Sequence, residues 1–126
     1  MALALGGITM LARAAPPLVE VWKSRDCGCC KEWVKHLEAQ GFQVETHDTG
    51  NIDARTRLGM PVKYGACHTA QAAGYALEGH VPARDVLRLL TEKPDAVGPA
   101  FRGQRDPFDV LLVLRDGSAN SHQSHR

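Results

Sequence analysis

The chain of 126 residues lacks several features that define large functional classes. It has no apolar run of about 18 or more residues, the length at which a helix can cross a bilayer, so we expect no membrane span in the mature chain. Its 15 lysines and arginines are balanced by 14 aspartates and glutamates, whereas a nucleic-acid-binding domain normally carries a basic excess. It also has no internal repeat and no sustained heptad pattern. With 44% hydrophobic residues, the composition predicts one compact domain without a nucleic-acid partner.

Cysteine is scarce in the chain, but it is strongly clustered. Of the four cysteines, Cys27, Cys29 and Cys30 fall within four consecutive positions. Cys27 and Cys30 have the C-x-x-C spacing that lets two sulfurs form one disulfide or bind one metal ion. A lone cysteine often only fills a core, but three in a single turn indicate a reactive site. A disulfide between Cys27 and Cys30 would close too short a loop to stabilise the fold much, so redox chemistry and metal binding are the two interpretations that remain open.

The cysteine run lies where a strand is expected to meet a helix. Residues 18–22 are almost continuously apolar, which is typical of a central strand, and residues 31–40 carry an apolar stripe at helical spacing. The start of a helix has unpaired N–H groups and the positive end of the helix dipole, and both favour a thiolate over a thiol. Cysteines in such places can have pKa values lowered to about 3.5–7.5. The position therefore predicts thiolates at neutral pH, which are metal ligands and nucleophiles.

Residues 1–17 resemble a targeting segment. An apolar run at residues 2–11 precedes Ala12-Arg13-Ala14, an A-x-A cleavage pattern, although no lysine or arginine precedes the run. We expect a truncated signal peptide, with an apolar N-terminal arm as the alternative. Export would place the cysteines in an oxidising compartment.

The remaining pattern predicts a single α/β domain at residues 18–117, followed by a flexible Ser/His-rich tail at 118–126. Its expected elements, in chain order, are a strand (18–22), a helix (31–40), a strand (42–46), a helix (52–58), a hairpin (67–71 and 75–79) and a helix starting at Pro82. This β-α-β-α-β-β-α order is that of a thioredoxin-like domain with a central mixed sheet and flanking helices, whose first two strands are parallel. Residues 97–107 are rich in Gly and Pro and predict a linker, and residues 110–114 predict an added C-terminal strand.

The predicted topology gives the fourth cysteine a place. In a thioredoxin-like arrangement, the loop that leads into the hairpin packs against the C-x-x-C loop. Cys67 and His68 lie in that loop, so we expect both to face Cys27, Cys29 and Cys30 at the carboxyl end of the central strands, where open α/β sheets bind ligands. Elsewhere, we expect Met60 to fill the core, with a thioether ligand as the alternative, and His80 to have a structural role or to support the metal ligands. We expect His122 and His125 to lie in a disordered tail, with loose metal binding as the alternative.

Three motifs together resemble the CopG-type bacterial copper-resistance family. They are Cys27-Gly28-Cys29-Cys30, Ala66-Cys67-His68-Thr69 and residues 74–83. The likeness covers about residues 18–95, with a weaker echo at 106–112, and the chain departs from the family at 97–103, where the usual Met- and Gly/Pro-rich loop is shortened. The resemblance implies a periplasmic, thioredoxin-like protein that binds several cuprous ions and acts alongside other periplasmic copper-handling proteins. It assigns as ligands Cys27, Cys29, Cys30, Cys67 and His68.

The chemistry of the residues leaves alternatives to copper. Thiolates select Cu(I), but they also select zinc. A tetrahedral zinc site could use Cys27, Cys30, Cys67 and His68, and it would leave Cys29 unused. A thiol–disulfide oxidoreductase would use Cys27 to attack and Cys30 to resolve. The sequence favours a metal-binding protein over an enzyme and leaves open whether the site also exchanges disulfides.

Overall fold

The computed structural model describes residues 16–102 and 108–125 of the chain. The strands in this part are β1 (Val19–Lys23), β2 (Val44–His47), β3 (His68–Ala72), β4 (Tyr75–Glu78), β5 (Gly98–Arg102), β6 (Phe108–Val113) and β7 (Ala119–His125). The α-helices are α1 (Gly28–Ala39), α2 (Ile52–Arg57) and α3 (Ala83–Glu92), and a short 3₁₀ turn, η1, spans Val62–Tyr64. The signal-peptide prediction lies outside the described residues. Within them, no helix is long and apolar enough to cross a membrane.

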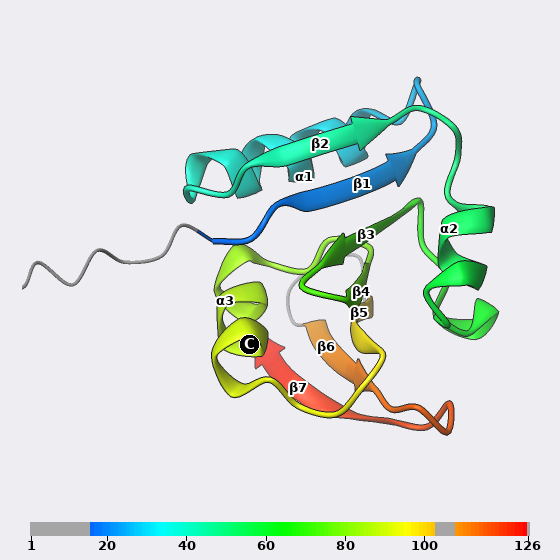
Figure 1. The fold of residues 1–126 in the computed structure, drawn as a ribbon, viewed down its shortest axis with the longest axis vertical. Coiled ribbons are helices and arrows are strands. Elements are labelled where there is room, and N and C mark those ends of the chain that lie inside the picture. Colours follow the sequence, from blue (N-terminus) through cyan, green and yellow to red (C-terminus); the bar gives the residue numbers. More distant parts are fainter. Residues whose placement is uncertain (1–15, 103–107, 126) are drawn as a thin grey trace, which may run out of the picture.

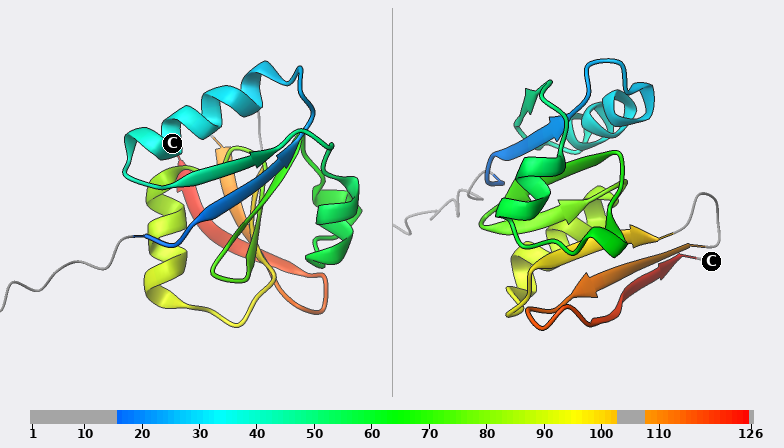
Figure 2. Two further views of the ribbon diagram at one scale, coloured as in Figure 1. Left: turned by 45° about the horizontal axis from the view of Figure 1, so that its top comes forward. Right: turned by 90° about the vertical axis from the view of Figure 1, so that its right-hand side faces the viewer.

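The strands form one mixed sheet in the order β2-β1-β3-β4-β5-β6-β7 (Figures 1 and 2). β1 and β2 are parallel and are joined through α1, as predicted, and β3 runs antiparallel to β1. β3 and β4 make the expected hairpin, and β4 then pairs in parallel with β5. The predicted α/β class and the order of the first seven elements are therefore confirmed.

Two apolar clusters lie on the two faces of this sheet. The larger one joins β1 to α1 and α3, and Leu77 of β4 belongs to it. The smaller one contains Met60, Ala76 and Val113, with Tyr64 of η1 packed against it. Ala76 and Leu77 are neighbours in β4 and point to opposite faces because side chains alternate along a strand. The segment from α2 to η1 thus covers the face opposite α1 and α3, and Met60 fills the core as expected.

The hairpin turn is tighter than the sequence predicted. Ala72 pairs with Tyr75, which leaves only Ala73 and Gly74 in the turn. Both have positive φ, +50° and +86°, as a two-residue turn matched to the twist of its strands requires.

The C-terminal part differs from the prediction in two places. Residues 97–107 were predicted as a linker, yet Gly98–Arg102 form β5, which pairs with both β4 and β6. Residues 118–126 were predicted as a flexible tail, yet Ala119–His125 form β7 along β6. Main-chain pairing holds this polar edge strand, so its side chains carry little strand signal. His122 is accordingly buried, with Nε2 lying 3.2 Å from the carbonyl oxygen of Asp85.

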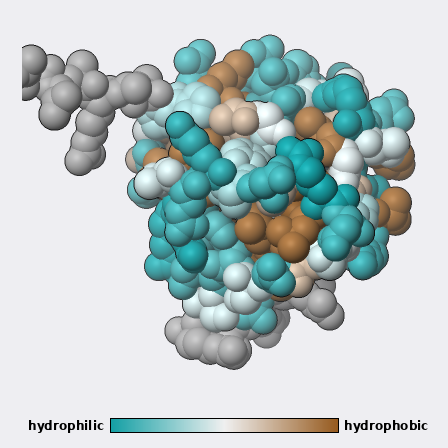
Figure 3. Space-filling model, turned by 60° about the horizontal axis from the view of Figure 1, so that its bottom comes forward, coloured by the Kyte–Doolittle hydropathy of each residue, from teal (hydrophilic) through white to brown (hydrophobic). Residues whose placement is uncertain are grey.

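Most of the surface in this view is hydrophilic, with apolar side chains in a central patch and in smaller groups toward the top and right edges (Figure 3). This distribution agrees with a sheet whose outer strands carry polar side chains toward solvent.

Gly98 is the position where the added strands meet the hairpin most closely. A Cβ at Gly98 would lie 1.8 Å from the carbonyl oxygen of Ala76, and the backbone there has φ +148°. We expect Gly98→Ala to lower the free energy of unfolding by about 3 kcal/mol or more, because strain and overpacking coincide. Urea denaturation followed by circular dichroism measures this loss.

The matched control is Gly28→Ala, because a Cβ at Gly28 meets nothing within 4 Å. If the two variants unfold at the same urea concentration, the close approach of β5 to β4 is wrong.

Candidate metal centre

The first turn of α1 presents the three clustered cysteines in different ways. Cys27 is the N-cap, and its Sγ accepts a hydrogen bond from the backbone N–H of Cys30 at 3.3 Å. Cys29 is exposed. Cys30 is fully buried and lies on the same face of α1 as Trp33 and Leu37, which follow it by three and seven residues. The start of the helix thus places the sulfur of Cys30 in the core, leaves Cys29 at the surface and keeps Cys27 half-buried.

An ion pair ties down the chain just before the cysteines. Lys23 ends β1, is 4% exposed and lies 2.5 Å from Asp48, the residue after β2. This hydrogen bond from Lys23 lowers the pKa of Asp48, and the nearby charges of Arg25 and Lys31 act in the same direction. The ion pair therefore fixes the end of β1 from which the cysteine loop starts, and the positive charges of Lys23, Arg25 and Lys31 lie nearby.

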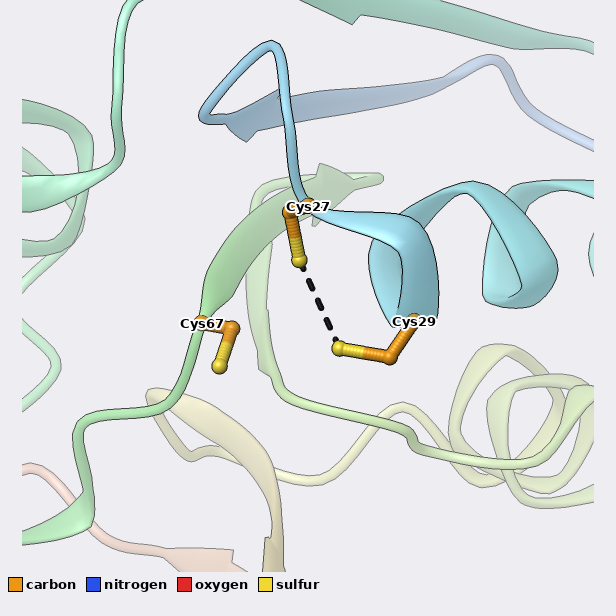
Figure 4. A group of neighbouring side chains, drawn as sticks. All are labelled: Cys27, Cys29 and Cys67. Carbon is orange, nitrogen blue, oxygen red and sulfur yellow. Dashed lines mark hydrogen bonds between the residues drawn. The ribbon is translucent and has the colours of Figure 1, made fainter.

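Cys67 reaches this site from a distant part of the sequence. It directly precedes β3, and the register of β3 on β1 pairs His68 with Lys23. The Sγ atoms of Cys27, Cys29 and Cys67 all lie within 4.8 Å of one another, and those of Cys27 and Cys29 are 3.4 Å apart (Figure 4). The topology-based expectation that Cys67 faces the cysteine loop therefore agrees with the structure. The ligand roles of these residues stay predictions.

Cys27 and Cys30 form a disulfide, while Cys29 and Cys67 are free and exposed. In this state two of the four sulfurs are bonded to each other and cannot act as thiolates. Partial burial raises the pKa of the Cys67 thiol, and the adjacent Cys29 raises it further through its charge and a hydrogen bond. The structure is thus the oxidised form of the site, with one disulfide beside two thiols.

This assignment predicts the labelling pattern of the metal-free protein. Iodoacetamide should modify Cys29 and Cys67 before reduction, and all four cysteines after reduction in denaturant, which exposes the buried Cys30. The rate at Cys67 should rise with pH through a range above that of an ordinary thiol, because only the thiolate reacts and its pKa is raised. Mass spectrometry of tryptic peptides measures both results. Four labelled cysteines before reduction would exclude the disulfide.

His68 lies apart from the three sulfurs. Its ring is fully buried and stacks between those of Trp33 and His80, with centroids 4.5 and 5.3 Å away. Nε2 is 2.8 Å from the carbonyl oxygen of Gly79, to which it donates, and Nδ1 has no hydrogen-bond partner among the described residues. Burial lowers the pKa of His68 to about 4, and the charge of His80 acts in the same direction. His68 is therefore a neutral core residue in this state, and its predicted role as a ligand remains untested.

A groove of about 860 Å³ opens beside the exposed thiols. Cys29 and Cys67 lie in its wall together with His80, and residues that the sequence did not single out complete it: Lys63, Tyr64, Phe101 and Leu111. These residues come from η1, β5 and β6. Lys63 and Tyr64 closely precede Cys67 in the chain but belong to no motif, whereas only the fold brings Phe101 and Leu111 to the site.

Solved structures of related proteins match this chain over most of its length. One, named "Copper resistance protein copG- Form 1", is 39% identical, and the match covers 87% of this chain and 98% of that one, with a TM-score of 0.77. The second, "Copper resistance protein copG- Form 2", is 38% identical over 88% and 99%, with a TM-score of 0.78. The chain belongs to the CopG copper-resistance family.

Other comparisons add little to this family assignment. A family model described as "Protein of unknown function, DUF411" matches residues 64–103, the part of the CopG fold that contains Cys67, the hairpin and α3. No curated protein matches the chain. The resemblance inferred from the cysteine motifs is thus confirmed at the level of the family.

Proposed function

We propose that this CopG-family protein binds Cu(I) through its cysteine sulfurs, in a cluster of several ions that share bridging thiolates, and that it serves copper resistance. The observation that carries the proposal is the convergence of Cys27, Cys29 and Cys67, whose Sγ atoms lie within 4.8 Å of one another. Thirty-six residues separate Cys30 from Cys67, so local sequence does not explain this convergence. The choice of copper as the metal rests on the names of the related structures.

The arrangement favours Cu(I) over zinc. The zinc alternative uses His68 and leaves Cys29 unused, yet Cys29 is one of the three converging sulfurs and His68 is buried between two rings. Thiolates are soft ligands, which suit Cu(I). One cuprous ion needs only two or three ligands, and the chain offers four sulfurs. This excess favours several ions that share bridging sulfurs.

Copper loading by all four sulfurs requires reduction of the disulfide. Cys27 and Cys30 are bonded to each other, and two electrons with two protons convert them to thiols. Each thiol then loses its proton when it binds metal. The oxidised protein offers only the thiols of Cys29 and Cys67, so its capacity for Cu(I) should be lower.

We also propose that the protein is exported to the periplasm. The apolar run at residues 2–11 ahead of an A-x-A pattern supports export. The Cys27–Cys30 disulfide also suits an oxidising compartment, where such bonds persist.

The cluster predicts the copper stoichiometry. Reduced protein titrated anaerobically with Cu(I) should take up more than one ion per chain, and all four thiols should lose reactivity together. Oxidised protein should take up less. The titration is followed by the ultraviolet absorption of copper–thiolate bonds and by metal analysis. A single-ion endpoint in the reduced protein would contradict the cluster.

A second candidate function is thiol–disulfide exchange with another protein, and the Cys27–Cys30 disulfide at the start of α1 supports it. Cys29→Ser separates the two candidates, because exchange needs only Cys27 and Cys30. In a copper cluster, the same variant should lower copper capacity. Because Cys29 is exposed, the substitution should leave the fold intact.

Insulin reduction and Cu(I) titration are measured on the same Cys29→Ser preparation. Cys67→Ala is the matched variant, since Cys67 is also an exposed free thiol, and it should lower Cu(I) affinity with the fold intact. Wild-type copper uptake in both variants together with full reductase activity would favour the oxidoreductase.

A further inference from the structure

A network of polar side chains lies beneath the loop that carries Cys67, and the proposed copper chemistry makes no use of it. Glu78, at the end of β4, is fully buried. Its carboxylate accepts hydrogen bonds from Thr69 Oγ1 at 2.6 Å, from the backbone N–H of Ala66 at 2.8 Å and from Arg55 Nη1 at 3.4 Å. Burying a carboxylate is costly even when it is paired. An apolar residue at this place in the sheet would avoid the desolvation cost. Stability of the sheet alone therefore does not explain why a carboxylate is buried here.

The network holds the peptide groups on both sides of Ala66. Glu78 accepts from the N–H of Ala66, and Asn51 Nδ2 donates to the carbonyl oxygen of the same residue at 3.0 Å. Asn51 Nδ2 also donates to Thr69 Oγ1 at 3.1 Å, which joins the two arms. The peptide group between Ala66 and Cys67, whose carbonyl oxygen accepts from Asn51, contains the backbone nitrogen of Cys67. On the other side of Cys67, His68 is fixed by its pairing with Lys23.

Because Gly65 has no side chain, the guanidinium of Arg55 can pack closely against the backbone of the loop that carries Cys67. A Cβ at Gly65 would lie 2.8 Å from Arg55 Nη1 and 2.9 Å from the carbonyl oxygen of Val62. The guanidinium of Arg55 therefore packs directly against the backbone two residues before Cys67, and the same guanidinium pairs with Glu78. The loop is supported along its length by side chains from α2, from the residue before α2, and from β4.

We propose that Glu78 and Asn51 are positioning residues, which hold Ala66 so that the sulfur of Cys67 stays within reach of the cysteines at the start of α1. The inference rests on the proposed copper function for its biological meaning, since it explains how a ligand from a loop meets ligands from a helix. Ligand-orienting residues outside the metal shell typically change metal affinity by about 10–100-fold when mutated.

Cross-linking in the oxidised, metal-free protein tests the positioning without copper. Cys29 and Cys67 are the free thiols, and diamide joins them into a disulfide while it takes up two electrons and two protons itself. Trypsin cuts after Arg25, Lys31, Lys63 and Arg84, so Cys67 lies in peptide 64–84 and the other cysteines lie in peptide 26–31. After alkylation of the remaining thiols, mass spectrometry of the linked peptides gives the rate of cross-linking.

We expect Asn51→Ala and Glu78→Leu to slow cross-linking about tenfold, because a released loop lowers the effective concentration of one thiol near the other. Glu78→Gln should stay close to wild type, since its amide oxygen can still accept from Ala66. The control is Leu89→Ala, which removes a buried side chain of α3 and destabilises the fold away from the loop. Cu(I) affinity of the reduced proteins should fall at least tenfold in the first two variants only.

The proposal is overturned if Asn51→Ala cross-links at the wild-type rate, or if Leu89→Ala slows cross-linking as much as the network variants do. Should Glu78→Leu fail to fold, Asn51→Ala and Glu78→Gln still decide. If the wild-type protein binds no Cu(I) while the network variants slow cross-linking, the proposed copper function fails and the positioning role stands.

Discussion

The antiparallel pairing of β3 with β1 is the constraint on which the site depends. The cysteine loop follows β1, and Cys67 precedes β3. Because the two strands run in opposite directions with Lys23 opposite His68, the end of one strand lies beside the start of the other. A shift of this register by two residues would move Cys67 by about 7 Å along β1, out of reach of the sulfurs of Cys27 and Cys29. The pairing of β3 with β1 thus brings Cys67 into the neighbourhood of the other sulfurs. The polar network around Ala66 then holds the backbone of Cys67 in place there.

Electrostatics explains why such a group of sulfurs needs a partner. Two thiolates about 4 Å apart repel by about 4 kcal/mol at the effective dielectric constant of a protein surface, so three cannot remain charged together without compensation. A proton, a disulfide or a cation can relieve the repulsion. The oxidised structure uses the first two, with a raised pKa at Cys67 and a bond between Cys27 and Cys30. Cuprous ions would relieve it in the reduced protein, so oxidation and metal binding compete for the same sulfurs.

Much of the site could be predicted because its signals are local or follow from topology. The cysteine run at a strand-to-helix junction is visible in the sequence, and the β-α-β-α-β-β-α order suffices to bring Cys67 to it. The prediction that both Cys67 and His68 face the sulfurs overlooked that adjacent residues of an extended chain point to opposite sides. Cys67 lies beside the sulfurs, and the His68 ring stacks between Trp33 and His80. The strands β5 and β7 were missed because backbone pairing holds them and their side chains, rich in Gly, Pro, Ser and His, carry no apolar alternation. The groove residues Phe101 and Leu111 could not be found from the sequence, since only the strands β5 and β6 bring them beside Cys29 and Cys67. Lys63 and Tyr64 lie in η1, shortly before Cys67, but belong to no motif that would mark them.

The four cysteines differ in what they contribute to the fold, and this difference follows from where α1 begins. Cys30 lies on the buried face of the helix with Trp33 and Leu37, so its sulfur is part of the core as well as of the disulfide. Cys29 and Cys67 lie at the surface, where removal of a sulfur leaves no cavity. Cys27 stands between these cases, because its Sγ caps the helix and also lies 3.4 Å from Cys29. Reduction of the disulfide therefore frees one sulfur at a helix cap and one against the core. A metal that uses all four thiolates must reach the buried sulfur of Cys30, which adjoins that of Cys27 but is not among the three sulfurs that lie within 4.8 Å of one another.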